Sequence, residues 1–446
     1  MNKRKTLISN LPVLIIIAFS PILQGQESHK WTLREAIDYA RENNIQVQSQ
    51  QISKSQSELG LEQAKAALFP SLSFSSNQSI GFSNTSSYNE FNEATGSSTY
   101  NGSYSLNSGV TLFAGGKLRN NIKQKEIQDQ ASGYDVEQAR TDIEVSVTQA
   151  YLQILYSHES VKIAEQSAEL SKAQAERALH MYNAGSISKA DLASLQAQAA
   201  NDEYQIISSQ TSLSSAKLQL KQLLELDMAE NFEVDFPEIN DNQVLASIPS
   251  LETVYNTALS ELPQMKSSAL SIEAADIAVE IARAAKMPTV SMSAGVSTSS
   301  TTASPDLLFD QLSNKINENV GININVPIFN GKQAKINVNN ARQQSLSARL
   351  QDQNTKKNLL STIESLYNDA LSAQSKYISA NKKLDAAKIS YDIVTEQFNS
   401  GLKNTVELIT ERNNYLNAQG NQLQAKYQAV LALKLLNVYQ NQPVTL

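Results

Sequence analysis

The sequence predicts an α+β protein built from two copies of one unit, each with a β-hairpin followed by a very long antiparallel helical hairpin. Three observations predict this fold class. Short motifs recur in the same order at an offset of about 218 residues that drifts to about 216, which marks a duplication. Two long spans contain no proline, and four segments alternate polar with apolar residues.

The first element is N-terminal. Lys3, Arg4 and Lys5 precede the apolar stretch Leu11–Phe19, a pattern typical of a secretory signal peptide, which we place at residues 1–25. A membrane anchor is the alternative, although the stretch is short for crossing a bilayer. No later run reaches 18 apolar residues, so membrane insertion of the mature chain would require β-structure.

Composition limits the possible functions. The 446 residues are 41% hydrophobic but only 6% aromatic, which suits long helices packed through small side chains. A net charge of −7 and the lack of a basic stretch argue against nucleic-acid binding. The absence of cysteine excludes disulfides, thiolate metal sites, thiol catalysis and a lipid anchor on an N-terminal cysteine.

The duplication divides the chain into repeat 1 (26–226), a linker (227–250), repeat 2 (251–440) and a tail (441–446). The matching motifs are Leu33–Ile37 with Leu251–Tyr255, Ala66–Pro70 with Ala284–Pro288, Phe113–Gly116 with Phe329–Gly331, and Tyr182–Gly185 with Phe398–Gly401. In each repeat we expect a helix, a β-hairpin (about 70–114 and about 288–329) and a long helical hairpin (about 116–226 and about 332–440). We also expect Pro263 to break or restart the helix that begins near Leu251.

The long helices lie in the proline-free spans 71–236 and 328–442. Helices over 117–182 and 333–398 would each extend about 100 Å at about 1.5 Å per residue. Apolar or small residues alternate at spacings of four and three, which predicts a coiled-coil seam. In the second copy the seam is Leu359, Ile363, Leu366, Ala370, Ala373, Tyr377, Ala380, Leu384, Ala387, Tyr391, Val394 and Phe398, and the first copy repeats it from Ile143 to Tyr182. Gly185 and Gly401 are expected to end these helices.

Four segments have the period-two pattern of strands. Their apolar positions are Leu72, Phe74, Ile80 and Phe82; Tyr100, Tyr104, Leu106, Val110 and Leu112; Val290, Met292, Ala294 and Val296; and Val320, Ile322, Ile324, Val326 and Ile328. Ser and Asn occupy the positions between them, and the stretches Ser83–Thr99 and Thr298–Ile316 are expected to be loops. Half-buried hairpins of a soluble domain are the alternative to membrane strands.

Membrane strands would require several chains. Four strands cannot close a barrel, and open sheet edges cannot face lipid because their backbone groups would lack hydrogen bonds. Three chains would supply about 12 strands, enough to enclose a pore. We therefore expect a trimeric 12-stranded barrel if the strands enter a membrane.

With these features the chain resembles the TolC-like outer-membrane efflux protein family over essentially its whole mature length. The resemblance rests on the duplication, the paired strand hairpins, the junctions at Phe113–Lys117 and Phe329–Lys332, and the turns at Tyr182–Gly185 and Phe398–Gly401. It implies a homotrimer in the outer membrane of a Gram-negative bacterium, with its barrel in lipid and a helical tunnel in the periplasm. It also implies a periplasmic adaptor (membrane fusion protein) and an inner-membrane pump.

The implied function is a passive exit duct of a tripartite efflux or type I secretion system. Whether the pump is a proton-driven RND transporter or an ABC-type ATPase stays open, as does the exported substrate. A secreted coiled-coil structural or adaptor protein without a barrel is the alternative.

The resemblance also implies a periplasmic gate at the helical turns. Its acid falls on Asp191 and its basic partner on Lys403, while Phe398 stands where a tyrosine hydroxyl is expected. An acidic ring falls on Glu407, and a second ring position becomes Thr410, with Glu411 beside it. Because lysine cannot form a bidentate pair, we expect a weaker closed state. Ordinary solvated helix faces are the alternative for these charges.

The turns themselves are the expected contact points for the adaptor. These tips are Gly185, Ser186, Gly401 and Leu402, and an exposed apolar leucine at a turn favours a protein contact.

No catalytic pattern is found, and we expect neither an enzyme nor a metal or other cofactor. His29, His158 and His180 are scattered along the chain. Gly115-Gly116-Lys117 lacks the spacing and the following Ser or Thr of a phosphate-binding loop. Energy for transport would therefore have to come from a partner protein.

Overall fold

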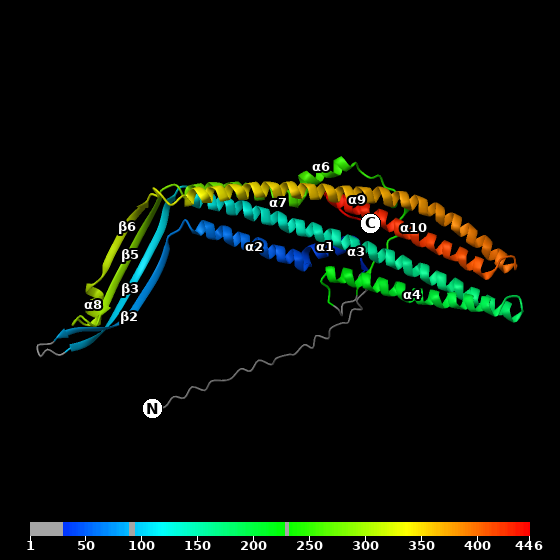
Figure 1. Cartoon of the computed structure of the whole chain (residues 1–446), viewed down its shortest axis with the longest axis horizontal. Coiled ribbons are helices and arrows are strands. Elements are labelled where there is room, and N and C mark those ends of the chain that lie inside the picture. The colour runs from blue at the N-terminus through cyan, green and yellow to red at the C-terminus, as the bar shows by residue number, and fades with distance from the viewer. Residues whose placement is uncertain (1–29, 89–93, 228–231) are drawn as a thin grey trace, which may run out of the picture.

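The computed structural model describes residues 30–88, 94–227 and 232–446, so the expected signal peptide at 1–25 lies outside the described residues. The molecule is elongated, with a four-stranded sheet at one end and two helical turns at the other (Figure 1). Within the described residues, no helix combines the length and the apolar character needed to cross a membrane.

The duplication is visible in the helices, which have matching lengths in the two copies. The first copy contains α1 (Leu33–Asn43), α2 (Ile45–Ala66), α3 (Lys117–Asn183) and α4 (Lys189–Leu223). The second contains α6 (Leu251–Glu261), α7 (Pro263–Ala284), α9 (Gln333–Asn399) and α10 (Thr405–Tyr439). Paired helices have 11, 22, 67 and 35 residues in both copies. The short helices α5 (Asp241–Val244) and α8 (Leu308–Asn314) have no counterpart among the described helices.

Local chemistry explains where the shorter helices begin. Asn44 separates α1 from α2, and its side-chain oxygen accepts the backbone N–H of Gln46. At the equivalent place in the second copy, Pro263 is the first residue of α7, where its missing N–H is not needed. The prediction that a helix restarts at Pro263 is confirmed.

The predicted coiled-coil seam is confirmed in both long helices. Every predicted seam residue of α9, from Leu359 to Phe398, is buried or half-buried. The seam of α3 is likewise buried or half-buried from Ile143 to Ala178, but Tyr182 at its end is exposed. Small seam residues such as Ala370, with no exposed surface, allow the helices to approach closely.

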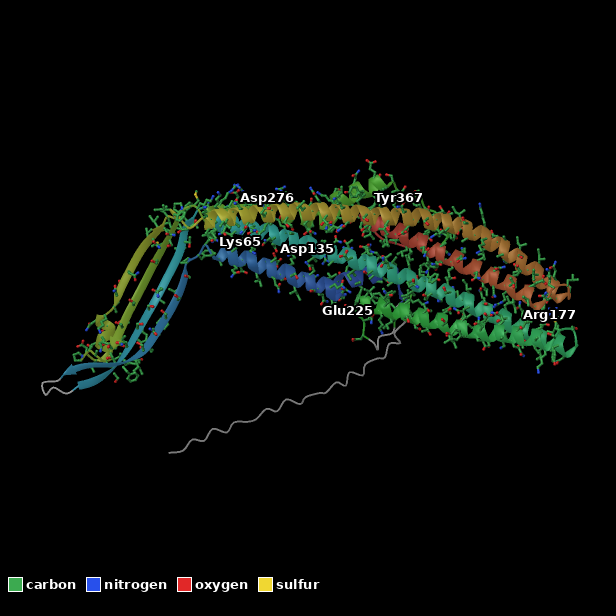
Figure 2. All side chains as sticks on the ribbon, viewed as in Figure 1. Lys65, Asp135, Arg177, Glu225, Asp276 and Tyr367 are labelled. Atoms are coloured by element: carbon green, nitrogen blue, oxygen red, sulfur yellow. The ribbon has the colours of Figure 1, made fainter. Side chains whose placement is uncertain are left out.

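Near the sheet, α7 lies between the two long helices and is fixed to each by polar contacts. Ser267 of α7 donates to Asp135 Oδ1 of α3 over 2.6 Å. Asp276 of α7 accepts from Ser345 and Arg349 of α9 over 2.5 and 2.6 Å. Figure 2 labels Asp135 and Asp276 along this part of the bundle. These contacts hold α7 against both long helices along its length.

The largest apolar core lies midway along the helices. It includes α1, the middle of α3, the ends of α4 and α10, and the segment 232–246. There β1 (Lys30–Trp31) pairs in parallel with β4 (Glu233–Val234). The buried hydroxyl of Tyr151 donates to the carbonyls of Trp31 and Asp235, so the first copy is tied to the linker region.

The four long strands form one antiparallel sheet in the order β2-β3-β5-β6. Their bounds are β2 Ser71–Tyr88, β3 Ala94–Ala114, β5 Thr289–Thr301 and β6 Asn317–Asn325. The sheet joins the helices at one end only, so its far end projects away from the bundle (Figure 1).

Three details of the strand prediction were wrong. β6 ends at Asn325, so Val326 and Ile328 lie outside it, because its partner β5 begins only at Thr289 and Pro327 has no N–H to pair. β2 and β3 continue into the expected loop Ser83–Thr99, where their backbones still pair. The expected loop Thr298–Ile316 contains the end of β5 and the helix α8.

Candidate functional site

The sheet has one polar and one apolar face. In register across the strands, the polar face carries Ser71, Ser73, Ser75, Asn77, Asn101, Ser103, Ser105, Asn107, Ser291, Ser293, Ser297, Asn319, Asn323 and Asn325. The apolar face carries Leu72, Phe74, Leu106, Val110, Met292, Val296, Val320, Ile322 and Ile324. The predicted alternation is therefore confirmed for most of the sheet. A bulge in β3 takes Leu112 out of the register, and Glu318 lies on the apolar face opposite Val296.

The polar face includes a crowded row at Gly295. A Cβ added to Gly295 would come within 2.9 Å of Oδ1 of both Asn107 and Asn319, its neighbours on β3 and β6. Because glycine has no side chain at this position, the amide side chains of Asn107 and Asn319 have room to lie across the polar face. The result is an uncharged, hydrogen-bonding surface of the kind that lines a water-filled pore.

The apolar face is exposed to a degree unusual for a soluble protein. Leu72, Val320 and Ile322 are 70%, 73% and 65% exposed. Large exposed apolar patches mark interaction surfaces, and this patch continues across four strands. Aromatic side chains are exposed at both ends of it: Phe69, Phe113 and Phe329 next to the helices, and Phe82 and Tyr100 towards the far end. Aromatic residues at two levels are typical of strands that cross a membrane.

The opposite end of the molecule is formed by the two helical turns. Gly185 and Gly401 both have the left-handed φ that ends a helix, at 76° and 74°. The next residue in each turn, Ser186 or Leu402, donates its backbone N–H to the carbonyl five residues earlier over 2.8 Å. All four predicted tip residues are exposed, and Leu402 is 77% exposed.

Each of the two predicted acids lies in the first turn of the second helix of its own hairpin. Asp191 forms a capping box with Ser188: each side chain accepts the other residue's backbone N–H, over 3.3 and 3.1 Å. Hydrogen bonds from the hydroxyls of Ser188 and then Thr405 hold the pKa of Asp191 below its usual value. Since Thr405 starts α10, Asp191 also connects the two turns.

Glu407 has the equivalent place in the second copy. It forms a capping box with Asn404, and Lys403 donates to its Oε1 over 2.5 Å. The Lys403 ammonium, followed by the Asn404 backbone, lowers the pKa of Glu407. Within one chain the ion-pair partner of Lys403 is thus Glu407, and its predicted pairing with Asp191 stays a prediction about contacts between chains.

The remaining predicted gate residues lie on α9 and α10. Phe398 is buried in a small apolar cluster at the tips, together with Leu192 and Leu408 of α4 and α10. Glu411 accepts from Ser390 of α9 over 3.0 Å, and Thr410 is exposed. The structure therefore gathers these residues at one end of the bundle, around a cluster that joins both hairpins.

A buried ion pair at this end was not predicted. Arg412 of α10 is 1% exposed and donates from Nη2 to Asp202 of α4 and to Ser167 Oγ and O of α3, the last two over 2.5 and 3.1 Å. Its Nε and Nη1 are buried and have no hydrogen-bond partner among the described residues. The spacing in the sequence was a signal for this pair. Asp202 lies seven residues from Leu195 and from Ser209, in a heptad repeat of buried positions on α4 that continues to Ala216. The pair joins the two hairpins just behind the turns.

In the described part of the chain, no three His, Asp or Glu side chains are grouped to hold a metal ion.

Comparison with known proteins places this architecture in a family. The chain is 21% identical over 431 residues to the outer membrane efflux protein BepC of Brucella suis, covering 94% of this chain and 87% of BepC. It has the fold of the solved Campylobacter jejuni CmeC outer membrane channel, with a TM-score of 0.75, 19% identity, and coverage of 98% and 94% of the two chains. The outer-membrane channel OprN superposes with a TM-score of 0.76 at 16% identity, over 92% of this chain and 90% of OprN. The sequence profile of the family described as "Outer membrane efflux protein" matches residues 36–225 and 254–439, well over half of the chain, and the chain therefore belongs to that family.

Proposed function

We propose that this chain forms the outer-membrane exit duct of a tripartite efflux or type I secretion system. The observation that carries the proposal is the two-faced sheet, whose exposed apolar face suits lipid and whose Ser and Asn face suits a water-filled lumen. In this arrangement the sheet lies in the outer membrane and the helices extend into the periplasm.

A single chain cannot complete this duct. β2 and β6 are the open edges of the sheet, and their outer backbone groups would be unsatisfied in lipid. If β6 of one chain pairs with β2 of the next, three chains of four strands each close a barrel of about 12 strands, wide enough for a pore. We infer a homotrimer on this ground.

The helices support the same assembly. On α2, Ile45, Ile52 and Leu59 are spaced seven residues apart and each is more than 60% exposed. On α9, Leu371 and Ile378 are also seven apart and exposed. Heptad stripes of this kind are buried when helices of neighbouring chains pack together. Three such chains would form a helical tunnel that continues the barrel lumen.

We further propose that the gate residues close this tunnel at its periplasmic end. Asp191, Phe398, Lys403, Glu407 and Glu411 lie at the end of the bundle furthest from the sheet. Trimerisation would place three copies of each around one axis, where the carboxylates of Glu407 and Glu411 would narrow the opening for anions.

The exposed tips are the proposed contacts for the periplasmic adaptor, through which the duct reaches an RND or ABC-type pump. Leu402 and the nearby Val406 are both over 70% exposed, while Gly185, Ser186 and Gly401 expose backbone. The apolar side chains at the second turn can insert between helices of a partner. In this proposal the chain is a passive conduit and the pump supplies the energy.

Two neighbouring substitutions test the proposal. Ile322 lies on the apolar face and Asn323 on the polar face of β6. Arginine facing lipid costs about 2–4 kcal/mol at the bilayer midplane, whereas arginine facing the lumen costs little. Ile322→Arg should therefore reduce the amount of heat-modifiable oligomer in the outer-membrane fraction. Asn323→Arg should assemble normally but shift the ion selectivity of channels in planar bilayers towards anions.

Equal effects of the two substitutions on assembly would contradict the assignment of the faces. A wild-type chain that is extracted from cells without detergent and forms no channels would contradict the proposal as a whole.

A further inference from the structure

The helix α8 in the β5–β6 connection carries an exposed apolar segment that the proposed duct leaves unexplained. Leu307, Leu308 and Phe309 are consecutive, and they are 75%, 58% and 80% exposed. Polar residues surround them, among them Asp306 and Asp310. In a loop at the far end of the sheet, three large apolar side chains in water are unfavourable unless something covers them.

α8 has a defined position, because Gln311 fixes it to the free edge of β5. The last pair between β5 and β6 is Ser297 with Asn317, so β5 has no strand partner on that side beyond this point. There the Gln311 side chain accepts the N–H of Thr301 over 2.8 Å and donates to its carbonyl over 3.1 Å. Gln311 is only 4% exposed. Its amide thus replaces one step of the missing strand ladder and holds the helix in place.

A second contact shows on which face of the sheet α8 lies. The hydroxyl of Thr298 donates to the carbonyl of Leu312 over 2.7 Å. Thr298 is two residues beyond Val296, and side chains at that spacing share a face. Thr298 also pairs with Tyr104, as Val296 pairs with Leu106. α8 therefore lies on the apolar face, about 7 Å beyond Val296 at about 3.4 Å per residue.

The helical geometry then directs Phe309 away from the sheet. Phe309 precedes the buried Gln311 by two residues, which is about 200° around a helix. With Gln311 against β5, Phe309 points outward from the apolar face, and Leu307 and Leu308 precede it. Tyr104 and Tyr100 lie on the same face at this level and beyond it, as in the aromatic belt of a membrane strand.

We propose that Leu307, Leu308 and Phe309 insert into the boundary between headgroups and acyl chains of the surrounding lipid and anchor the far end of the sheet. This inference rests on the proposed function, since it needs the apolar face to be in a bilayer. A short apolar segment of this kind enters about 5–10 Å at the interface, with its charged neighbours remaining in water. The anchor would limit how far each chain can slide along the membrane normal.

The absence of cysteine allows a direct test. The full-length protein would carry Phe309→Cys, Asn314→Cys or Ile322→Cys, each labelled with the same maleimide fluorophore and reconstituted into phosphatidylcholine–phosphatidylglycerol vesicles. Lipids with shallow or deep nitroxides quench labels in the bilayer, and iodide quenches labels in water. Asn314 is the matched control, because it is exposed on the same helix about 140° around from Phe309.

We expect shallow nitroxides to quench the label at 309 at least about twofold more than the label at 314, as interfacial insertion requires. Iodide should quench the two labels in the opposite order, and deep nitroxides should quench the label at 322. If lipid nitroxides quench the labels at 309 and 314 equally, the proposed anchor is wrong. Quenching of the label at 322 would in that case still support the proposed duct. No lipid quenching at 322 would instead contradict the proposed function. A label at 309 that is shielded from lipid and iodide alike, with Phe309→Cys crosslinking two chains, would overturn the anchor in favour of a contact between copies.

Discussion

Removing one partner of the buried pair between Arg412 and Asp202 should loosen the two hairpins from each other near the turns. In Asp202→Leu, the guanidinium of Arg412 would keep only its bonds to Ser167, with Nε and Nη1 already unpaired in the buried site. An uncompensated buried charge of this kind costs about 3–5 kcal/mol. The double variant Asp202→Leu with Arg412→Leu buries no charge, and replacing a buried pair with apolar residues is neutral or stabilising by about 1–4 kcal/mol.

The assay is amide hydrogen exchange of peptides from the tips, residues 184–215 and 400–420, in the purified oligomer. Because about 1.36 kcal/mol corresponds to a factor of ten, the single variant should exchange about 150- to 5,000-fold faster there. The double variant should exchange at about the wild-type rate or more slowly. Arg34→Ala is a suitable control, since its exposed pair with Asp38 is worth only about 0.3–0.5 kcal/mol.

The reasoning would be refuted if Asp202→Leu left tip exchange unchanged. It would also be refuted if the double variant exchanged as fast as the single one, because the cost would then come from lost packing and not from an unpaired charge.

Three further predictions concern the turns. Lys403→Ala should raise the ion conductance of the purified channel in planar bilayers, because Glu407 loses its cation and the closed end weakens; unchanged conductance would remove Lys403 from the gate. The folded pKa values of Asp191 and Glu407 lie below the ordinary 3.8 and 4.5, so both caps contribute stability above those values and lose it as the pH falls through the lower folded values. Conductance should therefore rise below about pH 4, and Glu407→Gln should flatten that rise; a rise of the same size in Glu407→Gln would exclude the Glu407 cap as its source. Gly401→Ala should lower the free energy of unfolding by about 1 kcal/mol because of the left-handed φ alone, since no atom of the described residues lies within 4 Å of an added Cβ. Thermal unfolding followed by circular dichroism measures this loss. Gly420→Ala is the control, because Gly420 has equally open surroundings but lies within a helix.

Much of the fold could be predicted because its signals are local and repeated. The seam from Leu359 to Phe398 follows from a spacing of four and three, and the faces of the strands follow from alternation. Each signal occurs twice in the chain, so a chance match in one copy would have lacked support in the other. Asp191 and Glu407 were predicted as site residues. Their capping boxes with Ser188 and Asn404 were not predicted, although the S-x-x-D and N-x-x-E spacings indicate them.

The errors arose where a partner distant in sequence decides the outcome. β6 ends where its antiparallel partner β5 begins, whatever the apolar pattern of Val326 and Ile328 indicates. The helix α8 exists where a loop was expected, and it is held by Gln311 at the edge of another strand.

The duplication, the long proline-free helices, the two-faced strands and the glycine turns follow from residue patterns. The helices, strands and turns each depend on residues within a few positions of one another, and the duplication repeats those patterns. The tertiary structure alone brings Arg412 to an aspartate 210 residues away. It also decided that α8 lies on the apolar face. Burial and pairing depend on which helix faces and strand edges meet, and no local pattern specifies that meeting.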